Sequence, residues 1–178
     1  MATSRKMIDA VPQILIALGL TLIVIVGMSM ARAHAPSASE ANHEVTYLNH
    51  DVTTIEKFHS EYVGDNSNTV QLLHALPLGP RIERVEIHET EVIAVLTDAP
   101  DVDPLAERSD ALYSAVAFFA AVDNATAVTY QSPTASYSVI RWDVEDHFGW
   151  PLKDLLQSEG EWARVRTLIP SEAPFLVS

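Results

Sequence analysis

The chain has 178 residues, of which 48% are hydrophobic, and its 24 acidic and 11 basic side chains give a formal net charge of −13. This length allows one domain with a substantial core and excludes two large ones. Because the sequence contains no cysteine, disulfides, thiolate zinc sites, thiol nucleophiles and lipidated cysteines are excluded. After residue 33 the net charge is −15, from 8 basic and 23 acidic side chains, so we expect no binding to nucleic acid or to an anionic membrane surface there.

Residues 10–31 predict a transmembrane helix. These 22 residues contain no charged side chain, and a helix of that length spans roughly 33 Å, about the thickness of a bilayer core. Arg5 and Lys6 precede the stretch, and the positive-inside rule therefore places residues 1–9 in the cytoplasm as a tail. We expect a single-pass protein of the cell membrane, with the rest of its chain outside the cytoplasm and the cytoplasmic membrane as its first partner.

A cleaved signal peptide is the alternative interpretation of the same segment. Two small-x-small patterns, at 31–33 and 33–35, have the form that signal peptidase recognises. The apolar run exceeds the roughly 7 to 15 residues of a usual signal-peptide core, which favours a retained anchor. Residues 32–44 are small, polar and aperiodic, and they predict a flexible linker before an extracytoplasmic domain at 45–178.

The domain is expected to begin with a helix near Asp51. Thr53 and Glu56 have capping-box spacing, and Gly64 would end the helix. Its apolar face would consist of Ile55, Phe58 and Tyr62.

A second helix is expected after a cap at Asp65 or Asn66, and it would end at Pro77 and Pro80. Its buried side would consist of Val70, Leu72, Leu73, Leu76 and Leu78. The two helices would form a helix-turn-helix corner.

A β-hairpin is expected between Arg81 and Thr97, because β-branched residues flank a turn near 88–90. After a loop at 98–104, residues 105–122 have helical apolar spacing. Asp123 and Asn124 would close this helix.

The last third of the chain predicts two strands, at 127–131 and 136–142, and short helices at 143–148 and 151–157. The residues that follow show no strong pattern. Because helices and strands mix without strict alternation, we expect an α+β fold with a mainly antiparallel sheet and helices packed on it.

The string YVGDNSNTVQLLHALPL at 62–78 resembles the bacterial family called domain of unknown function 4825, in which a tyrosine, a Gly-Asp-Asn turn and a leucine-rich helix recur. The strings ALYSAVAFFAAVDNATAVTY and SYSVIRWDVEDHFGWPLKDL continue the resemblance, which covers about residues 50–158. Its most specific part is 62–66 together with Asp123 and Asn124. The resemblance implies an extracytoplasmic domain behind a membrane segment, and no catalytic motif.

Tyr62, Gly64, Asp65 and Asn66 are the candidate binding residues, because two polar side chains follow a glycine in the most specific part of the resemblance. The alternative interpretation of the same residues is a turn and a helix cap.

Asp98, Asp101 and Asp103 are candidate calcium ligands, since they place three carboxylates within six residues. The loop lacks the glycine turn and the distal glutamate of a helix-loop-helix calcium site, so a solvated turn with a cap at Asp103 is the alternative. The seven histidines lack HExxH spacing. We expect no bound metal and no cofactor.

Catalytic signatures are missing from the sequence: it contains no GxSxG, SxxK, GxGxxG or GxxxxGK[ST] pattern. We assign no catalytic residue and expect Trp142 and Phe148 in the core. The prediction is therefore a non-catalytic extracytoplasmic binding or sensor domain, with an envelope protein as candidate partner and the oligomeric state open. The alternative is a cell-envelope hydrolase whose His and Asp groups, such as His59 or His88, assemble only in the fold.

Overall fold

The computed structural model describes residues 44–178. The predicted tail at 1–9, the predicted transmembrane helix at 10–31 and the linker up to residue 43 lie outside the described residues. Within residues 44–178, no helix combines the length and the apolar character needed to cross a bilayer.

A four-stranded sheet forms one layer of the domain, in the order β1 (Ile82–His88), β2 (Glu91–Leu96), β3 (Ala127–Gln131) and β4 (Ser136–Ile140). The β1–β2 and β3–β4 pairs are antiparallel hairpins, whereas β2 and β3 run parallel. The hairpins agree with the sequence prediction, but the sheet as a whole is mixed. The parallel pair arises because a helix connects β2 to β3 and returns the chain to the same edge before β3 begins.

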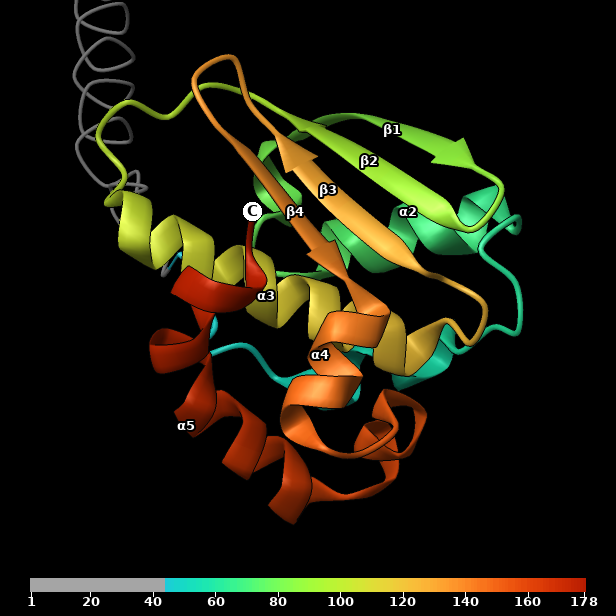
Figure 1. Ribbon diagram of the computed structural model, residues 1–178. Coiled ribbons are helices and arrows are strands. Elements are labelled where there is room, and N and C mark those ends of the chain that lie inside the picture. The colour runs from blue at the N-terminus through green and yellow to red at the C-terminus, as the bar shows by residue number, and fades with distance from the viewer. Residues whose placement is uncertain (1–43) are drawn as a thin grey trace, which may run out of the picture. The chain divides into compact units, whose positions relative to one another are not determined.

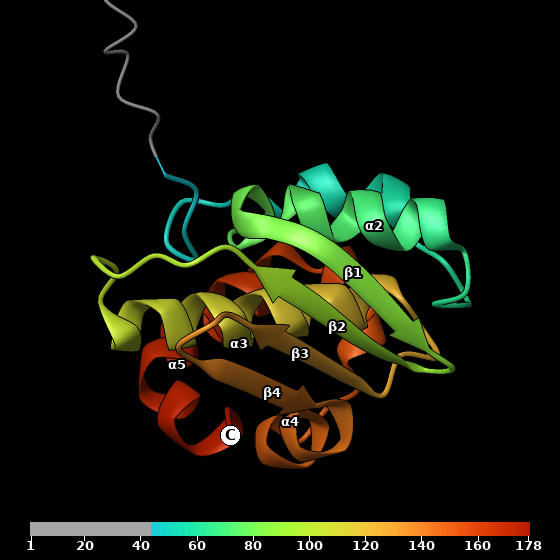
Figure 2. The same cartoon turned by 90° about the horizontal axis from the view of Figure 1, so that it is seen from above.

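The helix that makes this connection, α3 (Pro104–Ala121), is the centre of the core. Every residue from Ala111 to Ala121 is buried, as expected for a helix that is apolar on all sides. Figures 1 and 2 show the sheet on one side of α3 and the C-terminal helix α5 (Glu159–Leu176) on the other. Asp103 caps α3 by accepting a hydrogen bond from the Leu105 N–H at 3.1 Å.

One face of the sheet is buried against the helices. In β2, Val92, Ala94 and Leu96 are buried, while the alternate residues Ile93 and Val95 are only partly covered. This period of two is the strand pattern of a sheet with one packed face. Within the part of the chain that the structure describes, the helices gather on the packed face (Figure 2).

The first predicted helix is shorter than expected. The segment after Asp51 is the 3₁₀-helix η1 (Val52–Phe58), so it ends well before Gly64. Ile55 is fully buried, but the Tyr62 side chain is 64% exposed, and the prediction of Tyr62 on an apolar helix face was wrong. The second helix is confirmed as α2 (Asn66–Ala75), followed by the 3₁₀-turn η2 (Gly79–Arg81).

The predicted strand at 136–142 ends two residues early, because Arg141 begins α4 (Arg141–Phe148). Trp142 therefore lies on a short surface helix with 72% of its side chain exposed, and the expectation that it belongs to the core was wrong. Phe148 is buried, as expected. Gly149 ends α4 in the left-handed conformation, with φ at 77°.

The C-terminal part contains η3 (Leu152–Gln157) and a long helix, α5, that the sequence pattern did not predict. Pro170 and Pro174 lie inside α5, and prolines normally end a helix. The helix forms because it buries one side against α3, through Trp162, Val165, Ile169 and Ala173. After α5, Ser178 exchanges two backbone hydrogen bonds with Ser138 of β4, at 2.9 and 3.1 Å.

Candidate functional site

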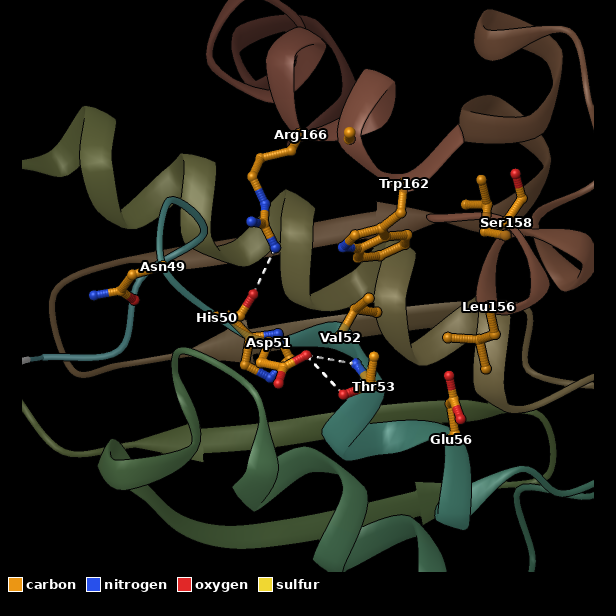
Figure 3. A pocket seen from close by; sticks show the side chains of 12 residues that line it. Asn49, His50, Asp51, Val52, Thr53, Glu56, Leu156, Ser158, Trp162 and Arg166 are labelled. Carbon is orange, nitrogen blue, oxygen red and sulfur yellow. Dashed lines mark hydrogen bonds between the residues drawn. The ribbon is translucent and has the colours of Figure 1, made fainter. Parts of the chain in front are cut away.

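A cavity lies between the first segment of the domain and its C-terminal helices. Its volume is about 570 Å³, within the range of roughly 300 to 1,000 Å³ that is usual for small-molecule sites. One wall comes from residues 49–56 and the other from 155–166 (Figure 3). The lining residues are Asn49, His50, Asp51, Val52, Thr53, Glu56, Leu155, Leu156, Ser158, Trp162, Ala163 and Arg166.

A buried tyrosine from α3 joins the two walls of the cavity. The Tyr113 hydroxyl lies 2.9 Å from Nδ1 of His50, 3.3 Å from Nε1 of Trp162 and 3.1 Å from Nη2 of Arg166. Trp162 and Arg166 can only donate, so the hydroxyl proton points to His50. Burial raises the pKa of Tyr113, which keeps this hydroxyl protonated.

The same geometry fixes the protonation of His50. Because Nδ1 accepts from Tyr113, the ring carries its proton on Nε2, which donates to the Ala75 carbonyl oxygen at 3.0 Å. Burial lowers the pKa of His50, and its neutral form is therefore favoured. With both nitrogens engaged, His50 is a structural part of the wall and is not placed as a general base.

Arg166 is the cation of the cavity. Its Nη2 donates to Tyr113 and to the His50 carbonyl oxygen, which pins the first segment of the domain to α5 (Figure 3). Its Nε is buried and has no hydrogen-bond partner among the described residues. Among the carboxylates whose side chains the structure describes, none forms an ion pair with Arg166.

Acidic groups lie on the opposite wall. Asp51 accepts hydrogen bonds from the N–H and the hydroxyl of Thr53, at 3.0 and 2.8 Å. These two hydrogen bonds lower the pKa of Asp51, so it is ionised. Glu56 is exposed at the same wall. The cavity thus offers a cation on one wall, carboxylates on the other, and apolar surface between them.

The predicted binding residues do not line this cavity. Asp65 accepts from the Asn68 N–H at 3.2 Å as the cap of α2, and Asn66 is the first residue of that helix. Gly64 is an exposed turn residue beside the exposed Tyr62. The structure therefore brings the four residues together in one turn, in the arrangement of the turn-and-cap interpretation.

The two most specific parts of the family resemblance meet in space. The Val63 N–H donates to Oδ1 of Asn124 at 2.8 Å. Ser60 pairs with the end of α3: its N–H donates to Ala121 at 2.9 Å, and its carbonyl accepts from the Asp123 N–H at 3.0 Å. These bonds attach the turn to the end of α3, which gives the motif a structural role.

The candidate calcium ligands take separate roles. Asp98 accepts a hydrogen bond from the Thr134 hydroxyl at 3.1 Å, Asp103 caps α3, and Asp101 is exposed in the loop between them. Within the described part of the chain, no three His, Asp or Glu side chains are grouped so that they could hold a metal ion.

The two histidines of the hydrolase alternative lie apart on the surface. Nε2 of His59 is 3.6 Å from Asp123, and Nε2 of His88 is 3.5 Å from Glu86. All four side chains are more than a third exposed. Each histidine therefore pairs with a carboxylate in a solvated setting.

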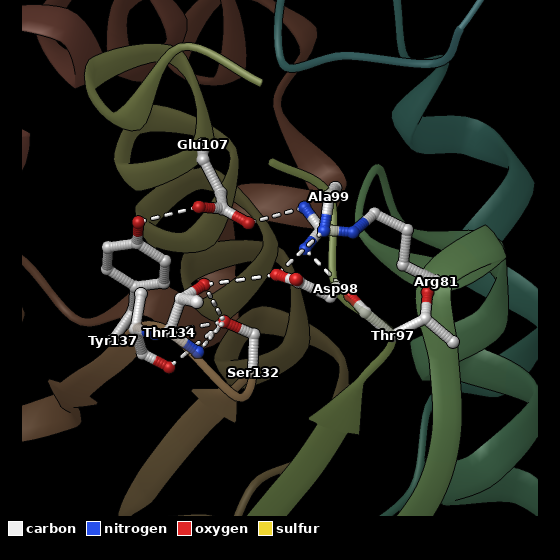
Figure 4. A network of polar contacts seen from close by, with 9 residues as sticks. Arg81, Thr97, Asp98, Ala99, Glu107, Ser132, Thr134 and Tyr137 are labelled. Atoms are coloured by element: carbon white, nitrogen blue, oxygen red, sulfur yellow. Dashed lines mark hydrogen bonds and ion pairs between the residues drawn. The ribbon is translucent and has the colours of Figure 1, made fainter. Parts of the chain in front are cut away.

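A second polar network lies at the N-terminal end of α3 (Figure 4). Glu107 is 8% exposed and accepts hydrogen bonds from Arg81 and, at 2.6 Å, from the Tyr137 hydroxyl. Burial and the Glu107 carboxylate raise the pKa of Tyr137 to about 12. Arg81 also donates to the Thr97 carbonyl at 3.0 Å. The network ties α3 to the ends of the sheet, and its members do not line the large cavity.

Sequence reasoning missed the residues of the cavity because they come from opposite ends of the domain. His50 and Arg166 are 116 positions apart. A usable signal was present: Trp162 and Arg166 are four residues apart, and this spacing places them on one side of a helix.

The fold and the cavity define a class of protein: an α+β domain built around one buried helix, with a ligand-sized cavity between its first and last segments. Residues 55–141 match the family described as domain of unknown function (DUF4825), so this part of the chain is similar to that family. The resemblance seen in the sequence is thus confirmed over a shorter range. No curated protein and no solved structure matches the chain. Of the residues that line the cavity, only Glu56 lies within the matched range.

Proposed function

We propose that this protein is a single-pass membrane protein whose extracytoplasmic domain, residues 45–178, binds a ligand as a sensor. The observation that carries the proposal is the cavity of about 570 Å³ with Arg166 and Trp162 in its wall. The charge-free stretch at 10–31 supports the anchor. The engagement of both His50 nitrogens favours binding over acid–base chemistry.

The position of the cavity along the chain supports a sensor. Residues 49–53 form part of its wall, and only residues 45–48 separate them from the proposed linker in the sequence. Tyr47 is held by its N–H, which donates to Oδ1 of Asp110 at 2.7 Å. A ligand that changes the wall therefore acts on the stretch of chain that leads to the anchor.

Localisation of the full chain tests the anchor. Cells that express it are fractionated, the intact mass of the protein is determined, and spheroplasts are treated with external protease. We expect the full mass in the membrane fraction and a domain that the protease reaches. A soluble product that starts near His34 or Pro36 would show that the apolar segment is only an export signal. A domain protected inside the spheroplasts would overturn the proposal.

A further inference from the structure

We propose that the cavity binds a small zwitterion of the amino-acid type, with its carboxylate at Arg166, its ammonium group at Asp51 and Glu56, and its apolar side chain against Leu155, Leu156 and Trp162. This inference rests on the proposed function, because it takes the cavity to be the ligand site. The juxtaposition that carries it is one cation on α5 facing two carboxylates on the η1 segment (Figure 3).

Arg166 provides the site for the carboxylate. Of its three nitrogens, Nη2 is occupied by Tyr113 and the His50 carbonyl, whereas Nε has no partner among the described residues. A guanidinium held in this way is already oriented, so a ligand carboxylate would lose little side-chain entropy on pairing with it.

Asp51 and Glu56 provide the site for the ammonium group. Both Thr53 hydrogen bonds are accepted by Oδ1 of Asp51, which leaves Oδ2 available for an ammonium donor. The Thr53 bonds also fix the orientation of the carboxylate. Figure 3 shows Asp51 and Glu56 on the wall opposite Arg166 and the Trp162 ring.

The middle of the cavity is apolar. Val52 comes from η1, Leu155 and Leu156 come from η3, and Trp162 comes from α5. An aliphatic side chain placed there would be removed from water, which favours binding.

Overall charge favours a zwitterion over an anion. The chain after residue 33 carries a net charge of −15, and a field of that sign lowers the local concentration of anionic ligands. A zwitterion has no net charge, so it is not repelled on approach and still presents a carboxylate to Arg166.

Fluorescence titration of the full chain in detergent tests the ligand class. Replacing Trp142 and Trp150 by Phe leaves Trp162, in the cavity wall, as the single tryptophan. The probes are L-leucine, N-acetyl-L-leucine without the ammonium group, and L-leucinamide without the carboxylate. We expect a saturable change with leucine, and binding at least about tenfold weaker for each blocked probe, the loss that one charge-assisted contact of about 1.4 kcal/mol produces.

Variants separate the two charged ends. We expect Arg166→Gln to abolish leucine binding, with Arg84→Gln, an exposed arginine on β1, as the control of equal charge change. Because Arg166 also holds His50, a second variant protects the test against misfolding. Asp51→Asn with Glu56→Gln keeps an acceptor for Thr53, and we expect it to remove the preference for leucine over N-acetyl-leucine.

Three outcomes would overturn the proposal that the ligand is a zwitterion. Equal binding of the three probes would retain the cavity as a ligand site for another chemical class. No response to any probe would exclude amino-acid-type ligands, while the localisation experiment would still decide the proposed topology separately. Leucine binding that survives in a folded Arg166→Gln protein would exclude the carboxylate position.

Discussion

Asp110 is an acidic residue of α3 held in a partly buried position beside the first residues of the domain. Burial, with smaller contributions from Glu44 and Glu107, raises its pKa from 3.8 to about 6. The Tyr47 N–H opposes this shift by donating to the carboxylate. Above pH 6 the native state therefore holds an unfavourably placed charge close to the start of the domain.

Because its pKa is raised, we expect Asp110 to make the stability of the domain depend on pH. Below about pH 4 it is protonated in both the folded and the unfolded chain and costs nothing; between pH 4 and 6 its cost grows, and above 6 the cost is complete. We expect Asp110→Asn to raise the free energy of unfolding by up to about 2 kcal/mol at pH 7.5 and by little at pH 4. Urea unfolding at both pH values measures this.

Asp101→Asn is the matched control for that measurement, because Asp101 is an exposed loop residue. We expect it to change stability by less than about 0.5 kcal/mol at either pH. An Asp110→Asn effect of the same size at pH 4 and pH 7.5 would contradict the assignment.

Glu107 is expected to be essential for stability. Glu107→Gln keeps the shape of the side chain but leaves Arg81, whose side chain is only 15% exposed, without its counter-ion. Breaking one partner of a buried pair costs about 3 to 5 kcal/mol. Glu86→Gln, at the exposed Arg84 pair, should cost less than about 1 kcal/mol. Chemical denaturation measures the free energy of unfolding of both variants. Similar decreases in the two variants would refute the prediction.

At the scale of elements, the turn at 62–66 is expected to act through its attachment to α3. Asn124→Ala removes the acceptor of the Val63 N–H, and an unsatisfied partly buried donor costs about 1 to 3 kcal/mol. Tyr62→Ala removes an exposed ring from the same turn and should change stability by less than about 0.5 kcal/mol. Thermal unfolding of the two variants measures this difference. Equal losses of stability would show that the hydrogen bond between the turn and the end of α3 does not stabilise the domain.

Elements whose signals are local could be predicted from the sequence. The two hairpins, α2 with its Asp65 cap and α3 with its Asp103 cap follow from patterns within a few residues. The parallel β2–β3 pair could not be predicted this way, because its partners are separated by the whole of α3. α5 could not be predicted this way either, because it contains two prolines and its buried side depends on contact with α3.

The candidate site illustrates the same limit. The turn at 62–66 attracted attention because its polar residues are adjacent in the sequence, and adjacency of that kind is also what a cap requires. The cavity depends on His50, Trp162 and Arg166, all of which contact Tyr113. Convergence of distant residues is a property of the packed helices and is not encoded in any local pattern.

The whole domain is larger than its family match. Residues 55–141 contain the sheet and α3, but one side of α3 is covered by η3 and α5, which follow the match. We expect a chain truncated after Gly149 to lose cooperative unfolding, because the apolar residues of α3 would face water. Circular dichroism during urea titration measures this.

Phe175→Ala is the companion variant of the truncation, since Phe175 is on α5 and 79% exposed. It should unfold cooperatively, with stability within about 0.5 kcal/mol of the unaltered chain. A truncated chain that also unfolded in one sharp transition would mean that the matched range is a complete folding unit.

The Tyr113 hydroxyl has a consequence for the timing of folding during synthesis. Its partners are His50, near the start of the domain, and Trp162 and Arg166, near the end. Synthesis proceeds from the N-terminus at about 5 to 20 residues per second, so His50 and Tyr113 emerge seconds before Arg166. In a nascent chain the first segment therefore has no α5 to hold it, and the cavity can close only after Arg166 has left the ribosome.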